Sequence, residues 1–436
     1  MSASVGSEVP LSRVQPPGPA PVERPLRVCF VSADYPTTSP QGVGGIGAHT
    51  YALAHAIADL GHEVSVITQS DNGADTHADG PVAVHALASG STRMWKLGHW
   101  VPVYWVRRSL AVWRALQRLQ AERPFDIVSF ADGYGEGCRY SLSPLGPFAV
   151  QLFGPATLVQ QWDGRSVPPF RARIESWMER RPATGAALVV SATRRFADLM
   201  IRQWSLAPER IRIIRNPLDL DRFRPAPAAR QHHSKRVLFA GHLQRLKGLH
   251  ALAAAIPIVA RKHPDVEFQL VGNDTRSGPG GISMRRFLEQ TLAESGMLDR
   301  VLISDSMPQS ELIPLYQNCT VFVLPSLNDV YPNAVLEAMA CGRPCVVTET
   351  VGAAELIAES QCGLVVPPGD ADALAAAISE LLALPASSRD EVGARGRRMV
   401  ERVCATPVIA AQTIAAYRSV IGEPARRGRA LSAHRP

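Results

Sequence analysis

Long apolar runs are absent from this sequence of 436 residues. A helix that crosses a membrane needs about 18 or more apolar residues in succession, and no window provides them. Residues 1–25 are rich in proline and have no apolar core, so they lack the pattern of a secretory signal peptide. We expect these residues to form a disordered tail and the protein to stay in the cytoplasm.

Metal-ligand patterns are lacking as well. The seven cysteines include no C-x-x-C pair, and the twelve histidines include no H-E-x-x-H motif. Two D-x-D triplets, at 219–221 and 370–372, resemble metal sites in letters only, because the first lies in an expected hinge and the second at an expected helix start. We therefore expect buried free thiols, no metal and no cofactor.

Acidic residues are absent between positions 91 and 120. The net charge of +7 suits nucleic acid, an anionic membrane or phosphorylated ligands, and composition does not choose among them. The segment interleaves basic and aromatic side chains, namely Arg93, Lys96, Arg107, Arg108, Arg114 and Arg118 with Trp95, Trp100, Tyr104, Trp105 and Trp113. At a helical period Arg107, Arg114 and Arg118 share one stripe, which faces away from Trp105, Val112, Leu116 and Leu119. We expect the apolar side to pack on a sheet, and the basic stripe suits anionic lipid.

The chain repeats a pattern of buried strand, loop and helix in two series. The first begins with a strand at 26–32, a glycine-rich loop at 41–47, a helix at 48–60 and a strand at 63–68, which is a βαβ unit. Further strands are expected at 126–130, 148–152, 188–191 and 211–214.

A second series follows a polar, proline-containing segment at 224–234. It opens with a strand at 236–240, a helix at 248–262 and a strand at 266–271. Strands are then expected at 320–324, 344–348 and 363–366, and helices at 334–340 and 372–384. The two series predict an α/β protein with two doubly wound Rossmann-like domains, at 26–224 and 235–406, and a basic tail at 423–436. Ligands should bind at the carboxyl ends of the strands, where the domains face a central cleft.

Three segments carry candidate chemistry. Gly44, Gly45 and Gly47 let a backbone approach an anion at a helix start, although a tight turn needs the same residues, and their spacing disfavours a dehydrogenase. A basic side chain in the loop 239–248 can pair with a diphosphate, or it can simply be solvated. Near position 333 a helix start can hold phosphate while Glu337 accepts ribose hydroxyls, or Glu337 can merely complement the helix dipole.

Taken in order, these segments resemble the family 4 glycosyltransferases over residues 26–422. The matching residues are Gly44-Gly45, Gly61-His62-Glu63-Val64, Arg215-Asn216-Pro217-Leu218-Asp219 with Phe223, Lys247-Gly248, Leu336-Glu337-Ala338-Met339-Ala340 and Gly363-Leu364-Val365-Val366. The resemblance implies the GT-B fold and retaining transfer of a sugar from a nucleotide-diphosphate donor, with a helix at 407–420 that crosses back onto the first domain. A nucleotide-sugar epimerase and an inactive protein that binds nucleotide sugar or membrane are the alternatives.

The resemblance also implies site residues. The family has an acidic residue eight positions before its ribose-binding glutamate, which here is Asp329 before Glu337. Asp329 should touch the donor sugar, Glu337 the ribose and Lys247 the diphosphate. Gly45 and the backbone of Val335 and Leu336 should add N–H groups to the donor site, which also includes Asn333. The sugar or acceptor pocket should include Gly44, Gly47, His49 and Phe153.

Three positions depart from the family pattern. Asp329 stands where glutamate is usual, and His242 stands where arginine is usual, so a protonated imidazole or Arg245 must complete the phosphate clamp. Phe153 replaces a histidine that bonds a distal donor hydroxyl, which favours a 6-deoxyhexose or pentose unless Gln151 or water supplies that bond.

The expected partners follow from these assignments. They are a nucleotide sugar, a saccharide, lipid-linked or small-molecule acceptor, and an anionic membrane surface at the inner face of the cell membrane. No nucleic acid is expected. The departing phosphate can take the acceptor proton, so no protein general base is assigned.

Overall fold

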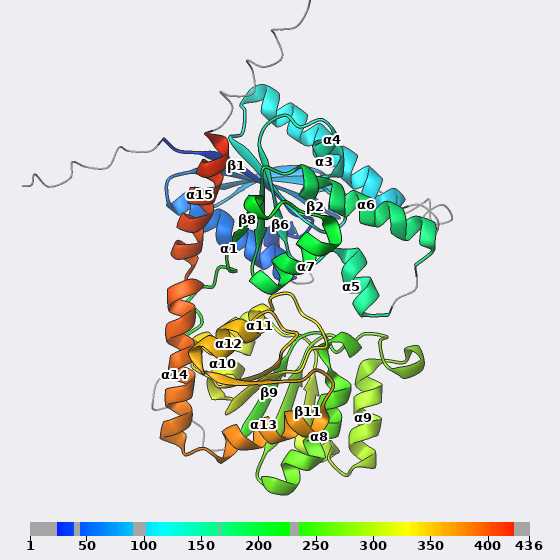
Figure 1. Cartoon of the computed structure of the whole chain (residues 1–436), viewed down its shortest axis with the longest axis vertical. Helices are drawn as coiled ribbons and strands as arrows, with labels where there is room; N and C mark the ends of the chain where they lie inside the picture. The colour runs from blue at the N-terminus through cyan, green and yellow to red at the C-terminus, as the bar shows by residue number, and fades with distance from the viewer. Residues whose placement is uncertain (1–23, 39–43, 90–101, 165–166, 227–234, 423–436) are drawn as a thin grey trace, which may run out of the picture.

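The computed structural model describes residues 24–38, 44–89, 102–164, 167–226 and 235–422. It forms two α/β domains that lie one above the other along the long axis in Figure 1. The expected tails at 1–25 and 423–436 lie almost wholly outside these residues, as do Arg93, Lys96, Trp95 and Trp100 and most of the segment 224–234.

The first domain is built on an eight-stranded sheet in the order β3-β4-β2-β1-β5-β6-β7-β8. Its strands are β1 (Arg27–Val31), β2 (Glu63–Ser70), β3 (Asp75–Asp79), β4 (Val82–Ala88), β5 (Ile127–Ala131), β6 (Phe148–Leu152), β7 (Leu188–Ser191) and β8 (Ile211–Ile213). All neighbours pair in parallel except β3 with β4, a hairpin at the sheet edge. Neither strand of this hairpin was predicted. β3 is mainly polar and solvent-facing, as an edge strand allows, whereas β4 does have the alternating pattern of a strand.

The second domain is built on a parallel six-stranded sheet in the order β11-β10-β9-β12-β13-β14. Its strands are β9 (Arg236–Ala240), β10 (Glu267–Val271), β11 (Val301–Ser304), β12 (Val321–Leu324), β13 (Cys345–Thr348) and β14 (Gly363–Val366). Only β11 was not predicted, because it buries one residue and is too short to show a period.

Helices cover both sheets. Those of the first domain are α1 (Gly45–Asp59), α3 (Val103–Glu122), α4 (Cys138–Leu142), α5 (Ala156–Trp162), α6 (Pro169–Gly185) and α7 (Arg194–Trp204). Those that follow β9 are α8 (Leu249–Lys262), α9 (Met284–Glu294), α10 (Gln309–Asn318), α11 (Asn333–Ala340), α12 (Ala354–Ser360), α13 (Ala371–Ala383), α14 (Ala386–Val403) and α15 (Thr406–Ile421). Figure 1 shows α14 beside the second domain and α15 beside the first, where α15 packs on α1.

The predicted fold class is confirmed. β6, β7, β9 and β14 have the predicted bounds, α1 begins three residues earlier than predicted, and the other predicted elements differ by at most two residues at an end. The agreement arises because strands buried on both faces form short apolar runs bounded by turns. All seven cysteines are buried and free, as expected. No helix among the described residues is long and apolar enough to cross a membrane.

Candidate active site

Lys247 and Asp329 meet at the carboxyl ends of two adjacent strands. Lys247 lies in the short turn after β9, Asp329 lies after β12, and their Nζ and Oδ2 atoms are 2.5 Å apart. Gly248 makes this approach possible. Its φ is +71°, and a Cβ there would lie 1.8 Å from the Pro325 carbonyl oxygen, so a side chain would force the turn away from β12.

Glu337 lies one turn into α11 and is almost fully buried. Its Oε2 accepts a hydrogen bond of 2.8 Å from the hydroxyl of Tyr316 on α10. Burial raises the pKa of Glu337, while the bond from Tyr316 acts in the opposite direction. The sequence suggested a carboxylate open to a ribose, whereas one of its oxygens is already engaged by a buried phenol, which no sequence pattern indicates.

The helices α1 and α11 approach each other at their N-termini. A Cβ at Gly45, the first residue of α1, would lie 3.9 Å from Nδ2 of Asn333, the first residue of α11. The two starts come from different domains, and each presents the positive end of a helix. Such an arrangement favours an anion between them. Gly44 is exposed just before α1, whereas Gly47 is buried in its first turn.

The other predicted donor residues also lie on α11. The side chains of Val335 and Leu336 are fully buried in the second-domain core. The backbone N–H of Val335 donates to the Pro332 carbonyl at a long 3.3 Å. These residues therefore anchor α11, and their side chains are not available to a ligand.

Asn216 ties α11 to the first domain. Its Nδ2 donates to Asn333 Oδ1 at 2.9 Å, and the neighbouring Arg215 forms an ion pair of 3.3 Å with Glu355. The sequence singled out 215–219 as a motif without assigning these contacts, because their partners lie more than a hundred positions away.

His49 and Phe153, two of the residues predicted for the sugar or acceptor pocket, lie together with Gln151 in the first domain. The rings of His49 and Phe153 meet edge to face with centroids 4.9 Å apart, and Gln151 Nε2 lies 2.8 Å from His49 Nε2. Burial lowers the pKa of His49 to about 4, so its imidazole is neutral near pH 7 and accepts from the amide. One N–H of the Gln151 amide is thus engaged within the protein.

Phe153 begins a segment that touches the second domain. A Cβ at Gly154, where φ is +120°, would lie 3.0 Å from Val330 Cγ2, one residue after Asp329. The helix α5 continues this segment and ends near Arg245, whose Nη2 lies 3.4 Å from the Trp162 carbonyl oxygen. Arg245 is thus directed toward the first domain. The pKa of His242 is lowered by desolvation and by the Lys247 ammonium group, so its imidazole is neutral near pH 7.

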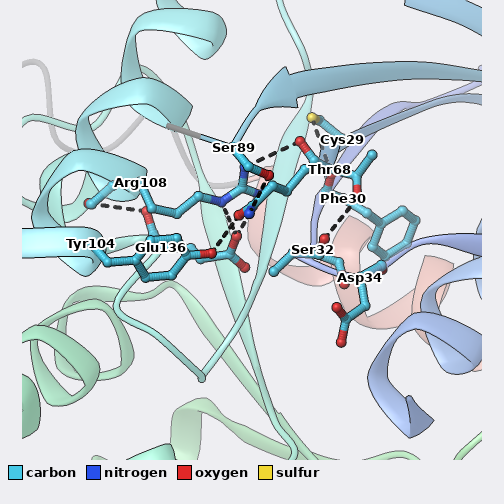
Figure 2. A network of polar contacts seen from close by, with 12 residues as sticks. Cys29, Phe30, Ser32, Asp34, Thr68, Ser89, Tyr104, Arg108 and Glu136 are labelled. Carbon is cyan, nitrogen blue, oxygen red and sulfur yellow. Dashed lines mark hydrogen bonds and ion pairs between the residues drawn. The ribbon is translucent and has the colours of Figure 1, made fainter. Parts of the chain in front are cut away.

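A buried ion pair lies at the carboxyl ends of β1, β2 and β5 (Figure 2). Arg108 of α3 contacts Glu136 at 2.7 Å and the Thr68 carbonyl at 3.2 Å, with Asp34 and Tyr104 nearby. Arg108 was predicted only as one of six basic residues, and Glu136 was not singled out. Their pairing neutralises the arginine inside the domain, whereas Arg107, Arg114 and Arg118 are exposed as the helical period predicted.

Two family models match the two domains in turn. Residues 44–217 match a model described as "Glycosyl transferase 4-like domain", and residues 234–384 match one described as "Glycosyl transferases group 1". The chain is 24% identical over 388 residues to the glycogen synthase of Mycobacterium tuberculosis, an alignment that covers 86% of this chain and 90% of that protein.

Solved structures agree in fold. The sucrose-phosphate synthase of Thermosynechococcus elongatus superposes with a TM-score of 0.73 at 23% identity, over 90% of this chain and 98% of that one. Anabaena Alr3699/HepE, solved in complex with UDP and glucose, superposes with a TM-score of 0.66 at 17% identity, over 90% of this chain and all of that one. With both domains matched in order, the chain belongs to the family 4 glycosyltransferases and is an enzyme of the GT-B fold.

Proposed function

We propose that the enzyme transfers a sugar from a nucleotide-diphosphate donor to a hydroxyl-bearing acceptor with retention of anomeric configuration. The observation that carries this proposal is the Lys247–Asp329 pair, which lies in the strand-end loops beside the facing starts of α1 and α11. An ammonium group and two helix N-termini attract a diphosphate, and a carboxylate beside them can accept hydroxyl groups of a sugar.

The donor would lie mainly on the second domain. The similar Anabaena protein, which was solved with UDP and glucose, supports a nucleotide sugar. Glu337 would receive the ribose hydroxyls, with Tyr316 holding the carboxylate in place. Lys247 would turn from Asp329 toward the diphosphate, which leaves Asp329 to contact the sugar.

Transfer requires the bond between the sugar carbon and the phosphate oxygen to break while a bond to the acceptor oxygen forms on the same face. The leaving diphosphate gains negative charge, which Lys247 and the helix N-termini stabilise. The acceptor proton passes to an oxygen of the departing phosphate, so atoms and charge balance without a protein base. The protein contributes chiefly positioning and electrostatic stabilisation, with no metal ion in the proposed step.

The acceptor would approach the first domain beside α1. The described residues there include the exposed carboxylate Asp34 and the half-exposed rings of Tyr104 and Tyr134, while Arg108 is neutralised by Glu136. Carboxylates and aromatic rings suit a hydroxyl-rich acceptor such as a saccharide, a lipid-linked sugar or a small glycoside.

A membrane surface is proposed as a further partner of the first domain. The exposed charges of α6 are arginines, because Glu175 and Glu179 are buried, and its exposed faces include Phe170 and Trp177. The short helix α4 packs against both α3 and α6, so the basic stripe of α3 belongs to the same helical layer. Arginines with interfacial aromatics suit an anionic bilayer on the cytoplasmic side.

The test is a thermal-shift screen with a panel of nucleotide sugars, because donor binding stabilises the native state. A stabilising donor is then incubated with candidate acceptors, and NMR of the product determines the anomeric configuration. We expect the nucleotide sugars of one base to stabilise the protein and the product to retain the anomeric configuration of the donor. An inverted product, or no stabilisation by any nucleotide sugar, would contradict the proposal.

A further inference from the structure

Two buried carboxylates lie beneath the segment 153–157 and have no part in the steps above. Asp132 follows β5 and Glu179 lies in the middle of α6, and each is at most 3% exposed. Neither forms an ion pair with any residue that the structure describes. A buried charge without a counter-ion is costly, so hydrogen bonds must compensate for the burial of these carboxylates.

Every backbone N–H of this segment is directed to one of the two carboxylates. Asp132 Oδ1 accepts from Phe153 N at 3.0 Å, and Oδ2 accepts from Gly154 N at 3.1 Å. Glu179 accepts from Ala156 N at 2.7 Å, from Thr157 N at 3.2 Å and from the Thr157 hydroxyl at 2.5 Å. Pro155 has no N–H to donate, so the set is complete.

The opposite side of this segment faces the predicted catalytic loops. Gly154 packs against Val330 beside Asp329, and the Phe153 ring packs on His49. Ala156 and Thr157 begin α5, which ends at the Trp162 carbonyl near Arg245. The carboxylates therefore hold one face of a segment whose other contacts reach both the Asp329 loop and the Arg245 loop.

We infer that Asp132 and Glu179 are positioning residues. They hold the segment 153–157 and α5 against the loops that follow β12 and β9, which contain Asp329 and Arg245. They act on sugar transfer through this segment and do not contribute to nucleotide binding. This inference rests on the proposed function for its kinetic consequence, but the positioning itself can be measured without turnover.

Ionisation links this arrangement to pH. Burial raises the pKa of Asp132 to about 7 and that of Glu179 to about 8, and the charge of Asp132 adds to the rise at Glu179. The groups that face Glu179 are Asp132, the hydroxyl of Thr157 and the phenol of Tyr134, which follows β5. A proton on either carboxyl converts an acceptor into a donor, which opposes the N–H groups it faces. The segment should be held most firmly when both groups are ionised.

The test compares Asp132→Asn and Glu179→Gln with Glu175→Gln as the matched control. Glu175 lies one turn earlier on α6, is equally buried and pairs with Arg171 at 2.7 Å instead of contacting the segment. Hydrogen exchange should become faster at 153–154 in Asp132→Asn and at 156–157 in Glu179→Gln, but not in Glu175→Gln. Should either variant fail to fold, Thr157→Val removes one bond to Glu179 without changing charge.

Kinetics with the donor found by the thermal-shift screen provide the second readout. We expect kcat to fall by about tenfold or more in Asp132→Asn and Glu179→Gln, because misplaced groups slow transfer, while affinity for the matching nucleoside diphosphate stays within about twofold. We also expect the kcat of the wild type to rise between about pH 6 and 9 as the two carboxyl groups ionise, and this rise should flatten in both variants. Unchanged exchange, or an equal loss of kcat in Glu175→Gln, would overturn the inference. Faster exchange without any turnover in the wild type would instead refute the proposed function and leave the positioning intact.

Discussion

Lys247 Nζ and Asp329 Oδ2 lie 2.5 Å apart although 82 positions separate them in the chain. The contact exists because β9 and β12 are neighbours in the second sheet, so the loops at their carboxyl ends meet. With both side chains less than one fifth exposed, the pair holds a cation in place where a leaving diphosphate would need it.

Removal of this cation should slow transfer. Lys247→Ala is expected to cost about 2–4 kcal/mol of transition-state stabilisation, measured as kcat/KM, as loss of a preorganised charge usually does. Lys262→Ala, at the exposed end of α8, is the control and should behave as the wild type. Wild-type kcat/KM in Lys247→Ala would remove Lys247 from the site.

Glu337 should be needed for donor binding. Glu337→Ala is expected to abolish detectable binding of the nucleotide sugar in calorimetry, because the ribose loses its acceptor. Tyr316→Phe should lower the free energy of unfolding by about 1–3 kcal/mol and weaken donor binding less, since it removes only one bond to the buried carboxylate. Circular dichroism checks that both variants fold. Undiminished donor affinity in Glu337→Ala would contradict the assignment.

An arginine at position 242 should strengthen the leaving-group site. Because desolvation and Lys247 lower the pKa of His242, its imidazole carries little charge near pH 7 and gains it only as pH falls. His242→Arg is therefore expected to raise kcat/KM near pH 7 and to reduce its change at lower pH. A lower kcat/KM with the nucleoside diphosphate still bound normally would show that His242 has a different role.

Phe153 should select the donor sugar. A phenyl ring has no hydrogen-bonding group for a distal hydroxyl, and one N–H of Gln151 already bonds His49. A hydroxyl stranded there would cost about 1–3 kcal/mol. We expect the wild type to prefer a 6-deoxyhexose or pentose donor, and Phe153→His to narrow or reverse that preference. The measurement is kcat/KM for one hexose donor and its 6-deoxy counterpart. A tenfold preference of the wild type for the hexose, about 1.4 kcal/mol, would refute this role.

Liposome binding should depend on charge. Co-sedimentation with anionic liposomes at low salt is expected for the wild type, and it should weaken when Arg107, Arg114 and Arg118 are changed to Glu, since each arginine contributes about 1 kcal/mol near an anionic surface. Trp177→Ala should weaken it further through lost interfacial contact. Neutral liposomes are the control, and equal sedimentation with both kinds would dismiss the membrane proposal.

Stability should fall as pH rises from about 5 to 8. Asp132 and Glu179 have folded-state pKa values of about 7 and 8, above their unfolded values, so the folded protein binds more protons in this window. Their contribution is present at low pH and is lost as pH rises, by at most about 1.4 kcal/mol per pH unit for each group. Thermal denaturation of Asp132→Asn and Glu179→Gln should show a flatter pH dependence. A wild-type protein whose stability increases as pH rises from about 5 to 8 would contradict this prediction.

Local sequence patterns predicted the two domains, most strands of both sheets and the order of the site motifs. Buried parallel strands form short apolar runs, and helix starts carry local glycine and proline signals. A short stretch of sequence is therefore enough to predict either kind of element. The same locality explains why the motifs that contain Lys247, Asp329 and Glu337 could be matched to the family pattern, which implies their roles. The polar edge strand β3 has no such local signal.

Which side chains meet depends on contacts between elements that are distant in the chain. The sequence listed Arg108 with five other basic residues, yet the fold buries it against Glu136, 28 positions away. Neither Tyr316 behind Glu337 nor Asp132 and Glu179 beneath Phe153 follows from a motif. Such contacts join elements that are distant in the chain, and a carboxylate is tolerated in a core only once the fold has brought hydrogen-bond donors to it.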